Sequence, residues 1–151
     1  MTVEEFRDVV ALWHVDEARD TDVVLAACEL VVAGVDGPAV SALAGASLKH
    51  AWEEMPPLLG DALRELGLDH HEHHTEGGRT EGLRLMARRT RSGAMSPREL
   101  AAWVRDSFGY GLPDAEPLAY LDGTYKTLEY TDLSSADVDQ LVLAEVRRLT
   151  S

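Results

Sequence analysis

Helix start and stop signals recur along this chain, and they constrain its fold more than any other feature of the sequence. Between these signals the apolar residues follow a helical spacing, as Phe6, Val9, Val10 and Trp13 do near the start of the chain. Stretches with the alternation of a β-strand are scarce, and we find neither an internal repeat nor a linker. We therefore expect an all-α fold, a single-domain helical bundle of about seven helices with short loops over residues 1–151.

The most specific start signals are capping sequences. Thr2 and Glu5 have the spacing of a capping box, in which each side chain accepts a hydrogen bond from the backbone amide of the other residue. Ser96, Pro97 and Glu99 combine an N-cap serine, a proline at the first helical position and a capping-box glutamate. Each of these sites predicts that a helix begins there.

Other boundaries follow from glycine, proline and small polar residues. A short helical turn around Trp52 is expected to break near Met55, because Pro56 and Pro57 lack amide donors and disfavour helix in the residues before them. Residues 69–80, which include two consecutive glycines, are the clearest loop, and their second half is also compatible with a frayed helix start. Besides the two capped helices, we expect helices over residues 20–31, 38–44, 57–66, 80–92, 115–130 and 134–149.

The formal charge of −13, from 27 acidic and 14 basic residues, is the strongest global property of the chain. Residues 1–76 carry −12, residues 77–111 carry +4 and residues 112–151 carry −5. Such a field repels nucleic acid and anionic membrane surfaces and accelerates encounter with basic proteins. We therefore expect a basic protein partner, no nucleic acid and no membrane. The alternative, that the acidity only keeps the protein soluble, stays open.

We expect the chain to act in the cytoplasm. Its first residues are acidic and lack the apolar run of a signal peptide, and no later stretch has the apolar length of a membrane span. Cys28 is the single cysteine, which excludes an internal disulfide. A lone cysteine in an apolar helical segment is usually a small core residue.

A histidine cluster is the one candidate metal site in the sequence. If the segment from His70 to His74 were helical, two or three of its histidines could meet a zinc or nickel ion, with Glu72 or Glu76 as an oxygen ligand. However, the metalloprotease pattern H-E-x-x-H fails when read from His71, because its final position is Thr75. A polar loop beside two glycines is also a poor frame for ligands. We therefore expect no metal.

Catalytic and cofactor-binding motifs are missing from the sequence. His14 and His50 have no serine, cysteine or carboxylate in a motif beside them, and each is expected to be a partly buried surface histidine. No glycine pair is followed by the lysine and hydroxyl residue of a phosphate-binding loop. The sequence therefore favours a protein without a cofactor and without enzymatic activity.

Arg84, Arg88 and Arg91 fall on one face of an expected helix in an otherwise acidic chain. Two interpretations are open for this stripe, a site for an anion or a surface that pairs with the acidic helices of the same chain. The excess of acids over bases favours intramolecular pairing.

An acidic and aromatic stretch between residues 120 and 139 is the candidate partner-binding surface. Tyrosine rings bury apolar area and keep a hydroxyl for hydrogen bonding, while carboxylates can occupy the place of substrate phosphates on a basic enzyme. The alternative is that Tyr125 belongs to the core and the other tyrosines cover it. The candidate residues are Tyr120, Asp122, Tyr125, Glu129, Tyr130, Asp132, Asp137 and Asp139.

Three features of residues 96–149 form a recognisable pattern. A helix start from Ser96 to Glu99, a turn at Tyr110 and an acidic aromatic stretch from Asp122 to Asp132 precede a final helix. This pattern resembles small bacterial immunity proteins of the colicin tRNase class. The resemblance implies an inhibitor that covers the active site of a basic nuclease. The N-terminal half, with the run ACELVVAGVDGPAVSALAG, resembles small uncharacterised actinobacterial proteins instead.

Three functional hypotheses are compatible with these features. The first is an acidic protein-binding module, an immunity-type inhibitor of a basic nuclease toxin. The second is a small-molecule binding or tailoring enzyme with a pocket inside the helical bundle, and the third is an adaptor without a ligand. Affinity that falls with salt would support the first, a buried apolar pocket the second, and an apolar surface patch the third.

Overall fold

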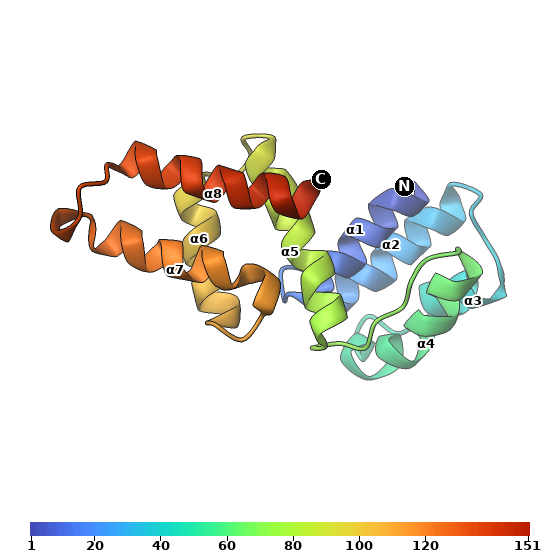
Figure 1. Ribbon diagram of the computed structural model, residues 1–151. Helices are drawn as coiled ribbons and strands as arrows, with labels where there is room; N and C mark the ends of the chain where they lie inside the picture. Colours follow the sequence, from blue (N-terminus) through green and yellow to red (C-terminus); the bar gives the residue numbers. More distant parts are fainter. The chain divides into compact units, whose positions relative to one another are not determined.

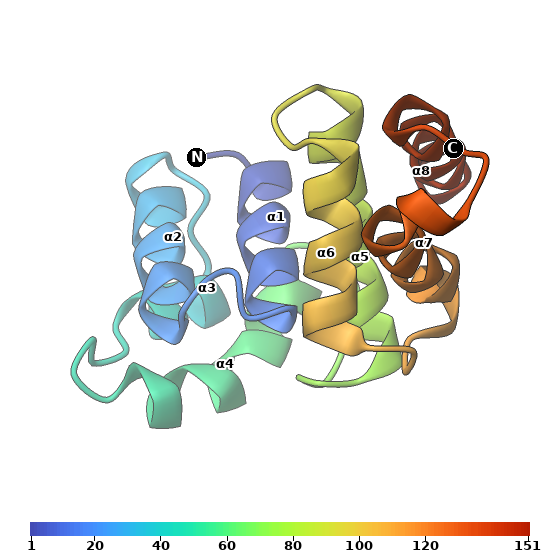
Figure 2. The same cartoon turned by 90° about the vertical axis from the view of Figure 1, so that its left-hand side faces the viewer.

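The structure is a computed structural model that describes residues 1–151, and it is all-helical with no β-strand, as the sequence predicts (Figure 1, with a second view in Figure 2). Its α-helices are α1 (Val3–His14), α2 (Asp20–Val32), α3 (Pro38–Ala44), α4 (Ala51–Glu65), α5 (Glu76–Arg91), α6 (Pro97–Phe108), α7 (Glu116–Lys126) and α8 (Ser135–Thr150). Two short 3-10 helices, η1 (Pro113–Ala115) and η2 (Leu128–Tyr130), flank α7. None of the helices combines the length and the apolar character that a membrane span requires.

The helix starts agree closely with the capping sequences. The Thr2 hydroxyl accepts a hydrogen bond from the Glu5 amide at 3.1 Å, and the Glu5 carboxylate accepts one from the Thr2 amide at 3.3 Å. Ser96 caps α6 by accepting a bond from the Glu99 amide at 3.1 Å. A complete capping box, formed by Ser134 and Asp137, also opens α8, whereas α6 has the serine cap without the capping box that the sequence predicts at Glu99. Local side-chain chemistry therefore sets these helix starts.

Two expected boundaries are wrong, and an alternative left open at a third is confirmed. Helix α4 runs through Pro56 and Pro57 without a break, because Met55 on its inner face is fully buried in the core. Helix α5 begins at Glu76, so the second half of residues 69–80 is a helix start, which was the alternative to a loop. Helix α7 ends at Lys126 and a 3-10 turn follows it, so the expected helix to residue 130 is interrupted.

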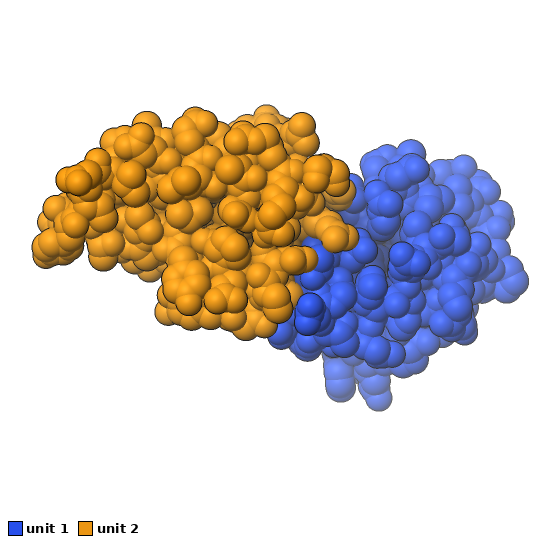
Figure 3. Space-filling view, in the orientation of Figure 1, with its two compact units in different colours: residues 1–82 blue, residues 83–151 orange.

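The chain divides into two compact units, Met1–Gly82 and Leu83–Ser151, with the division inside α5 (Figure 3). In the first unit, helices α1 to α4 enclose an apolar core. Its largest fully buried side chains are Phe6, Leu30, Leu43, Met55, Leu59 and Leu63. The single domain expected from the sequence stays a prediction.

The second unit is held together by contacts of α6 with α7 and of both with α8. Its buried side chains recur at helical spacing on one face of each helix, which is what the amphipathic pattern predicts. They include Leu100 and Val104 on α6, Leu118 on α7, and Val138, Val142 and Val146 on α8.

Candidate functional site

The structure separates the eight predicted partner-binding residues into an exposed group and an internal group. Tyr120 is 59% exposed, Tyr130 is 82% exposed, and Glu129, Asp132 and Asp137 are also exposed. The other three have internal partners. These are Asp122, Tyr125 and Asp139.

Tyr125 links two helices of the second unit and is only 3% exposed. Its hydroxyl on α7 donates a hydrogen bond to Asp139 on α8. Burial, together with that hydrogen bond, raises the pKa of Tyr125 above its ordinary value. Asp122 is buried as well, and it pairs with Lys126 at 2.9 Å one helical turn later. In this structure Tyr125 and Asp122 therefore stabilise the unit and offer no surface to a partner.

Asp137 also has a structural role, although it is exposed. Its carboxylate accepts a hydrogen bond from the Ser134 amide at 2.9 Å, and the Ser134 hydroxyl accepts one from the Asp137 amide at 3.2 Å. The backbone bond to Ser134, and then the side-chain bond, lower the pKa of Asp137. Asp137 thus completes the capping box of α8 and carries a charge at the surface.

Four of the five exposed predicted residues lie in one continuous surface segment, and Tyr120 lies outside it. Every residue from 129 to 137 is exposed, and we call residues 129–137 the acidic run. The acidic run contains three acids, no base, the 82% exposed Tyr130 and the exposed Leu133. Leu133 is not among the predicted residues, because it lies between two helices and follows no periodic pattern. The run therefore combines negative charge with exposed apolar groups.

Tyr120 lies next to a tyrosine that the sequence analysis did not select as a site residue. Its ring centroid is 4.8 Å from that of Tyr110, and Arg105 lies over the Tyr110 ring at 4.6 Å. Both tyrosines are about half exposed. Their contact depends on the packing of α6 against α7, which residue spacing within either helix could not indicate.

The arginine stripe lies beside an open cavity of about 400 Å³ in the second unit. Arg84 and Arg88 line the cavity together with Arg148, whose side chain bonds Glu145 at 2.8 Å and lies 3.8 Å from Asp114. Arg91 donates a hydrogen bond to the Thr150 hydroxyl at 3.1 Å. The acids Asp114 and Glu145 of this region therefore pair with Arg148.

In the first unit, the histidine-rich segment before α5 packs against the end of α1. The His73 ring stacks on Trp13 with centroids 4.0 Å apart, and the Trp13 indole donates a hydrogen bond to Asp20 at 2.7 Å. His14, the last residue of α1, is only 3% exposed, which corrects the expectation of a partly buried surface histidine. The exposed His50 lies outside this group.

Two consecutive glycines on α5 make room for the rings of this cluster. A Cβ atom on Gly78 would lie 2.5 Å from His14 Nδ1, and one on Gly77 would lie 2.5 Å from His71 Nδ1. These glycines favoured a loop in the sequence analysis, but both are helical. Packing requires glycine at both positions, because the imidazole rings lie directly against the helix backbone.

Burial keeps His14 and His73 in the neutral form. Burial first, and then the nearby charges of His73 and His71, lower the pKa of His14 from 6.5 to about 4. Burial and the neighbouring His74 also lower the pKa of His73. The Nδ1 atoms of His14 and His73 are buried and have no hydrogen-bond partner within the protein. Neutral imidazole is the form that binds metal ions.

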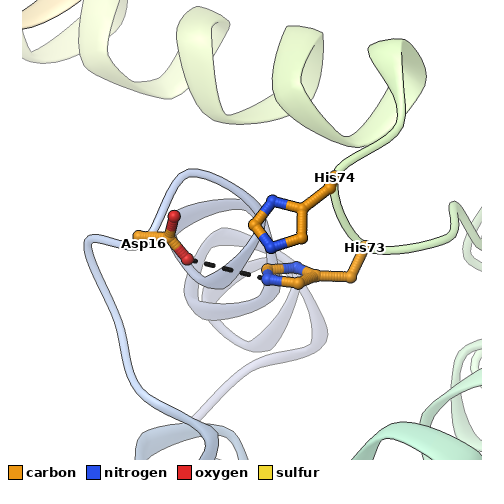
Figure 4. Close-up of side chains that lie close together, drawn as sticks. All are labelled: Asp16, His73 and His74. Atoms are coloured by element: carbon orange, nitrogen blue, oxygen red, sulfur yellow. Dashed lines mark ion pairs between the residues drawn. The ribbon is translucent and has the colours of Figure 1, made fainter. Parts of the chain in front are cut away.

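Two of these histidines converge with an aspartate from another segment. One ligand atom each from Asp16, His73 and His74 lie within 4.8 Å of one another, and Figure 4 shows the three side chains directed toward a common point. The separation between His73 Nε2 and Asp16 Oδ1 is 3.6 Å. Imidazole and carboxylate are the donor types that bind divalent first-row metals.

Comparison with known proteins gives no relative to which a function could be traced. No protein-family model, no curated protein and no solved structure matches this chain.

Proposed function

We propose that this chain is an acidic protein-binding module that binds a basic protein through the acidic run, with the exposed Tyr120 on α7 as a further contact. The observation that carries the proposal is the 82% exposed Tyr130 within a surface segment that holds three acids and no base. Exposed tyrosines are frequent anchors of protein interfaces, because burial of the ring gains apolar contact while the hydroxyl keeps a hydrogen bond.

The chemistry of the acidic run fits a partner that normally binds phosphate groups. Glu129, Asp132 and Asp137 would occupy the basic surface that a nuclease presents to its substrate, and the charge of the chain would accelerate the encounter. The resemblance of residues 96–149 to tRNase immunity proteins covers this segment and supports the same class of partner. The proposed partner is therefore a basic nuclease toxin, which this chain would inhibit in the cytoplasm by covering its active site.

The proposal can be tested by measuring binding kinetics against basic nucleases and against the product of the neighbouring gene. The double variant Glu129→Gln/Asp132→Asn removes two charges from the acidic run and avoids Asp137, which caps α8. We expect this variant to associate more slowly and with a weaker dependence on salt. Tyr130→Ala should mainly accelerate dissociation, because it removes an anchor and leaves the charge unchanged.

A matched control separates the local surface from the net charge. Glu99→Gln/Asp106→Asn also removes two exposed charges from the second unit, but both residues lie on α6, outside the acidic run. We expect its association rate to remain close to that of the unmodified chain. Equal slowing in both double variants would show that the acidic run is not the binding surface. If no basic protein binds at low salt, the small-molecule alternative becomes the better hypothesis.

A further inference from the structure

We propose that Asp16, His73 and His74 form a binding site for one divalent transition-metal ion of the Zn²⁺ class. The three residues lie in the first unit, and the site is independent of the partner-binding function proposed for the acidic run. Two imidazoles and one carboxylate form a donor set that suits Zn²⁺ and its first-row neighbours. Three protein ligands would leave at least one coordination position for water or another small ligand.

The distances between the donor atoms favour a common ion. Adjacent donors around a tetrahedral zinc ion lie about 3.4 Å apart, given metal–ligand bonds of about 2.0–2.1 Å. His73 Nε2 and Asp16 Oδ1 are 3.6 Å apart, and the third donor, on His74, lies within 4.8 Å of both. Asp16 and His74 are exposed, so small rotations of their side chains can close the remaining gap.

The backbone at this site adopts a conformation that L-residues rarely occupy. Asp16 has a φ of 60° and His74 a φ of 65°, and they are the two non-glycine residues of the chain with positive φ. Successive side chains of an extended segment point in opposite directions, whereas the left-handed turn at His74 lets its ring lie beside that of His73, with centroids 3.8 Å apart. The unfavourable conformations therefore occur at two of the three residues whose side chains converge.

His73 is held in place before any ion binds. The His73 ring stacks on Trp13, whose indole is fixed by its hydrogen bond to Asp20. Asp16 and His73 also line an open cavity of about 410 Å³, which gives an ion a path from solvent. His73 is rigid, whereas the side chains of Asp16 and His74 can adjust, and the cavity gives an ion a path to them. The site can therefore bind an ion without rearrangement of the fold.

The proposal departs from the expectation of no metal because it uses a residue that no local motif contains. The spacing from His70 to His74 supplies no ligand frame by itself, and Asp16 follows α1, far away in the sequence. If the histidines of this segment bound the ion by themselves, substitution of Asp16 would leave the metal affinity unchanged. That difference is the basis of the test.

The test is a calorimetric titration of Zn²⁺ into the full chain after removal of any affinity tag and of bound metal with a chelator. We expect one Zn²⁺ per chain, and we expect Asp16→Asn and His74→Asn each to weaken binding at least ten-fold. Asparagine tolerates positive φ well, so both variants should keep the backbone while replacing a strong ligand with a weak one. Circular dichroism would verify that each variant is folded.

Glu72→Gln is the matched control. Glu72 is an exposed acid of the same histidine-rich segment and is not part of the converging group, so its substitution removes the same charge without removing a ligand. We expect its Zn²⁺ affinity to stay within about two-fold of the unmodified chain. No binding by the unmodified chain, or the same affinity in Asp16→Asn as in Glu72→Gln, would overturn the proposal. The visible spectrum of bound Co²⁺ gives a second readout, and a spectrum identical to that of aqueous Co²⁺ would also overturn it.

Discussion

Gly82 determines how closely α5 approaches α1 within the first unit. A Cβ atom at this position would lie 2.3 Å from Val15 Cγ1 and 2.8 Å from the backbone oxygen of Ala11. The valine side chain can turn aside, but a backbone oxygen inside a helix cannot. Glycine is a poor helix former, and its presence inside α5 is explained by this close approach.

We therefore predict opposite effects of two glycine-to-alanine substitutions. Gly82→Ala should lower the free energy of unfolding by about 1–3 kcal/mol, because the added methyl group overpacks the contact with α1. Gly123→Ala should raise it by about 1 kcal/mol, because a Cβ on this α7 residue meets no atom within 4 Å and alanine favours helix. Urea denaturation of both variants checks the pair. A stabilising Gly82→Ala would contradict the packing explanation.

His14 should make the stability of the protein depend on pH. Its pKa of about 4 in the folded state lies below the ordinary 6.5, so the folded chain binds fewer protons than the unfolded chain between these values. The free energy of unfolding should therefore fall as the pH is lowered from about 6.5 to about 4, by up to about 3 kcal/mol, with no contribution from this group above that window.

Urea denaturation across this pH range in the presence of a chelator measures the effect. His14→Leu should remove most of the slope, because no proton can then bind at the buried position. His50→Leu is the control, since His50 is exposed and lies outside the cluster. An unchanged slope in His14→Leu would show that another group causes the acid sensitivity.

At the scale of the helix, α4 shows how tertiary packing can override a local break signal. Pro56 and Pro57 deny hydrogen bonds to the carbonyl groups four residues earlier, on Trp52 and Glu53. Both of these residues are exposed, so water can solvate the two carbonyls. The opposite face of the helix buries Met55 and other apolar side chains, which offsets the lost hydrogen bonds.

Pro57→Ala should consequently stabilise the protein. Pro57 is exposed inside α4, and alanine restores an amide donor for Glu53, so we expect the free energy of unfolding to rise by about 1–3 kcal/mol. Pro38→Ala is the matched control, because Pro38 opens α3, where an amide would have no intrahelical acceptor. We expect little change there. Thermal or urea denaturation checks both, and a destabilised Pro57→Ala would contradict this account of α4.

Over the whole molecule, the negative charge is concentrated in the first unit. Residues 1–82 contain 17 acidic and 5 basic residues, a formal charge of −12, whereas residues 83–151 contain 10 acidic and 9 basic residues, a formal charge of −1. The acidic run is therefore a local feature of a nearly neutral unit. Repulsion between acids opposes the compact state of the first unit.

We predict that sodium chloride stabilises the protein. Chloride salt screens the repulsion among the acids of residues 1–82, so the free energy of unfolding should rise between low and physiological ionic strength. Urea denaturation at a fixed pH and increasing sodium chloride measures this effect. A free energy of unfolding that falls with salt would instead show that attractive ion pairs dominate.

The candidate surface was only partly predictable from the sequence. Acids and tyrosines near the C-terminal end indicated a surface between residues 120 and 139, where Tyr130 is exposed; its binding role stays a prediction. Burial of Tyr125 could not be distinguished from exposure, because its position depends on how α7 packs against α8. Asp137 carries a charge at the surface and also completes the capping box of α8. Of these two roles, only the capping follows from local residue spacing.

The sequence by itself determined the helical class of the protein and most of its helix starts, because hydrophobic periodicity and capping act between residues a few positions apart. Only the tertiary structure decided that α4 continues through its prolines and that Gly78 is helical beneath a histidine ring. It also brought Asp16 to His73. These outcomes depend on contacts between segments far apart in the chain, and such contacts leave no regular spacing in the sequence.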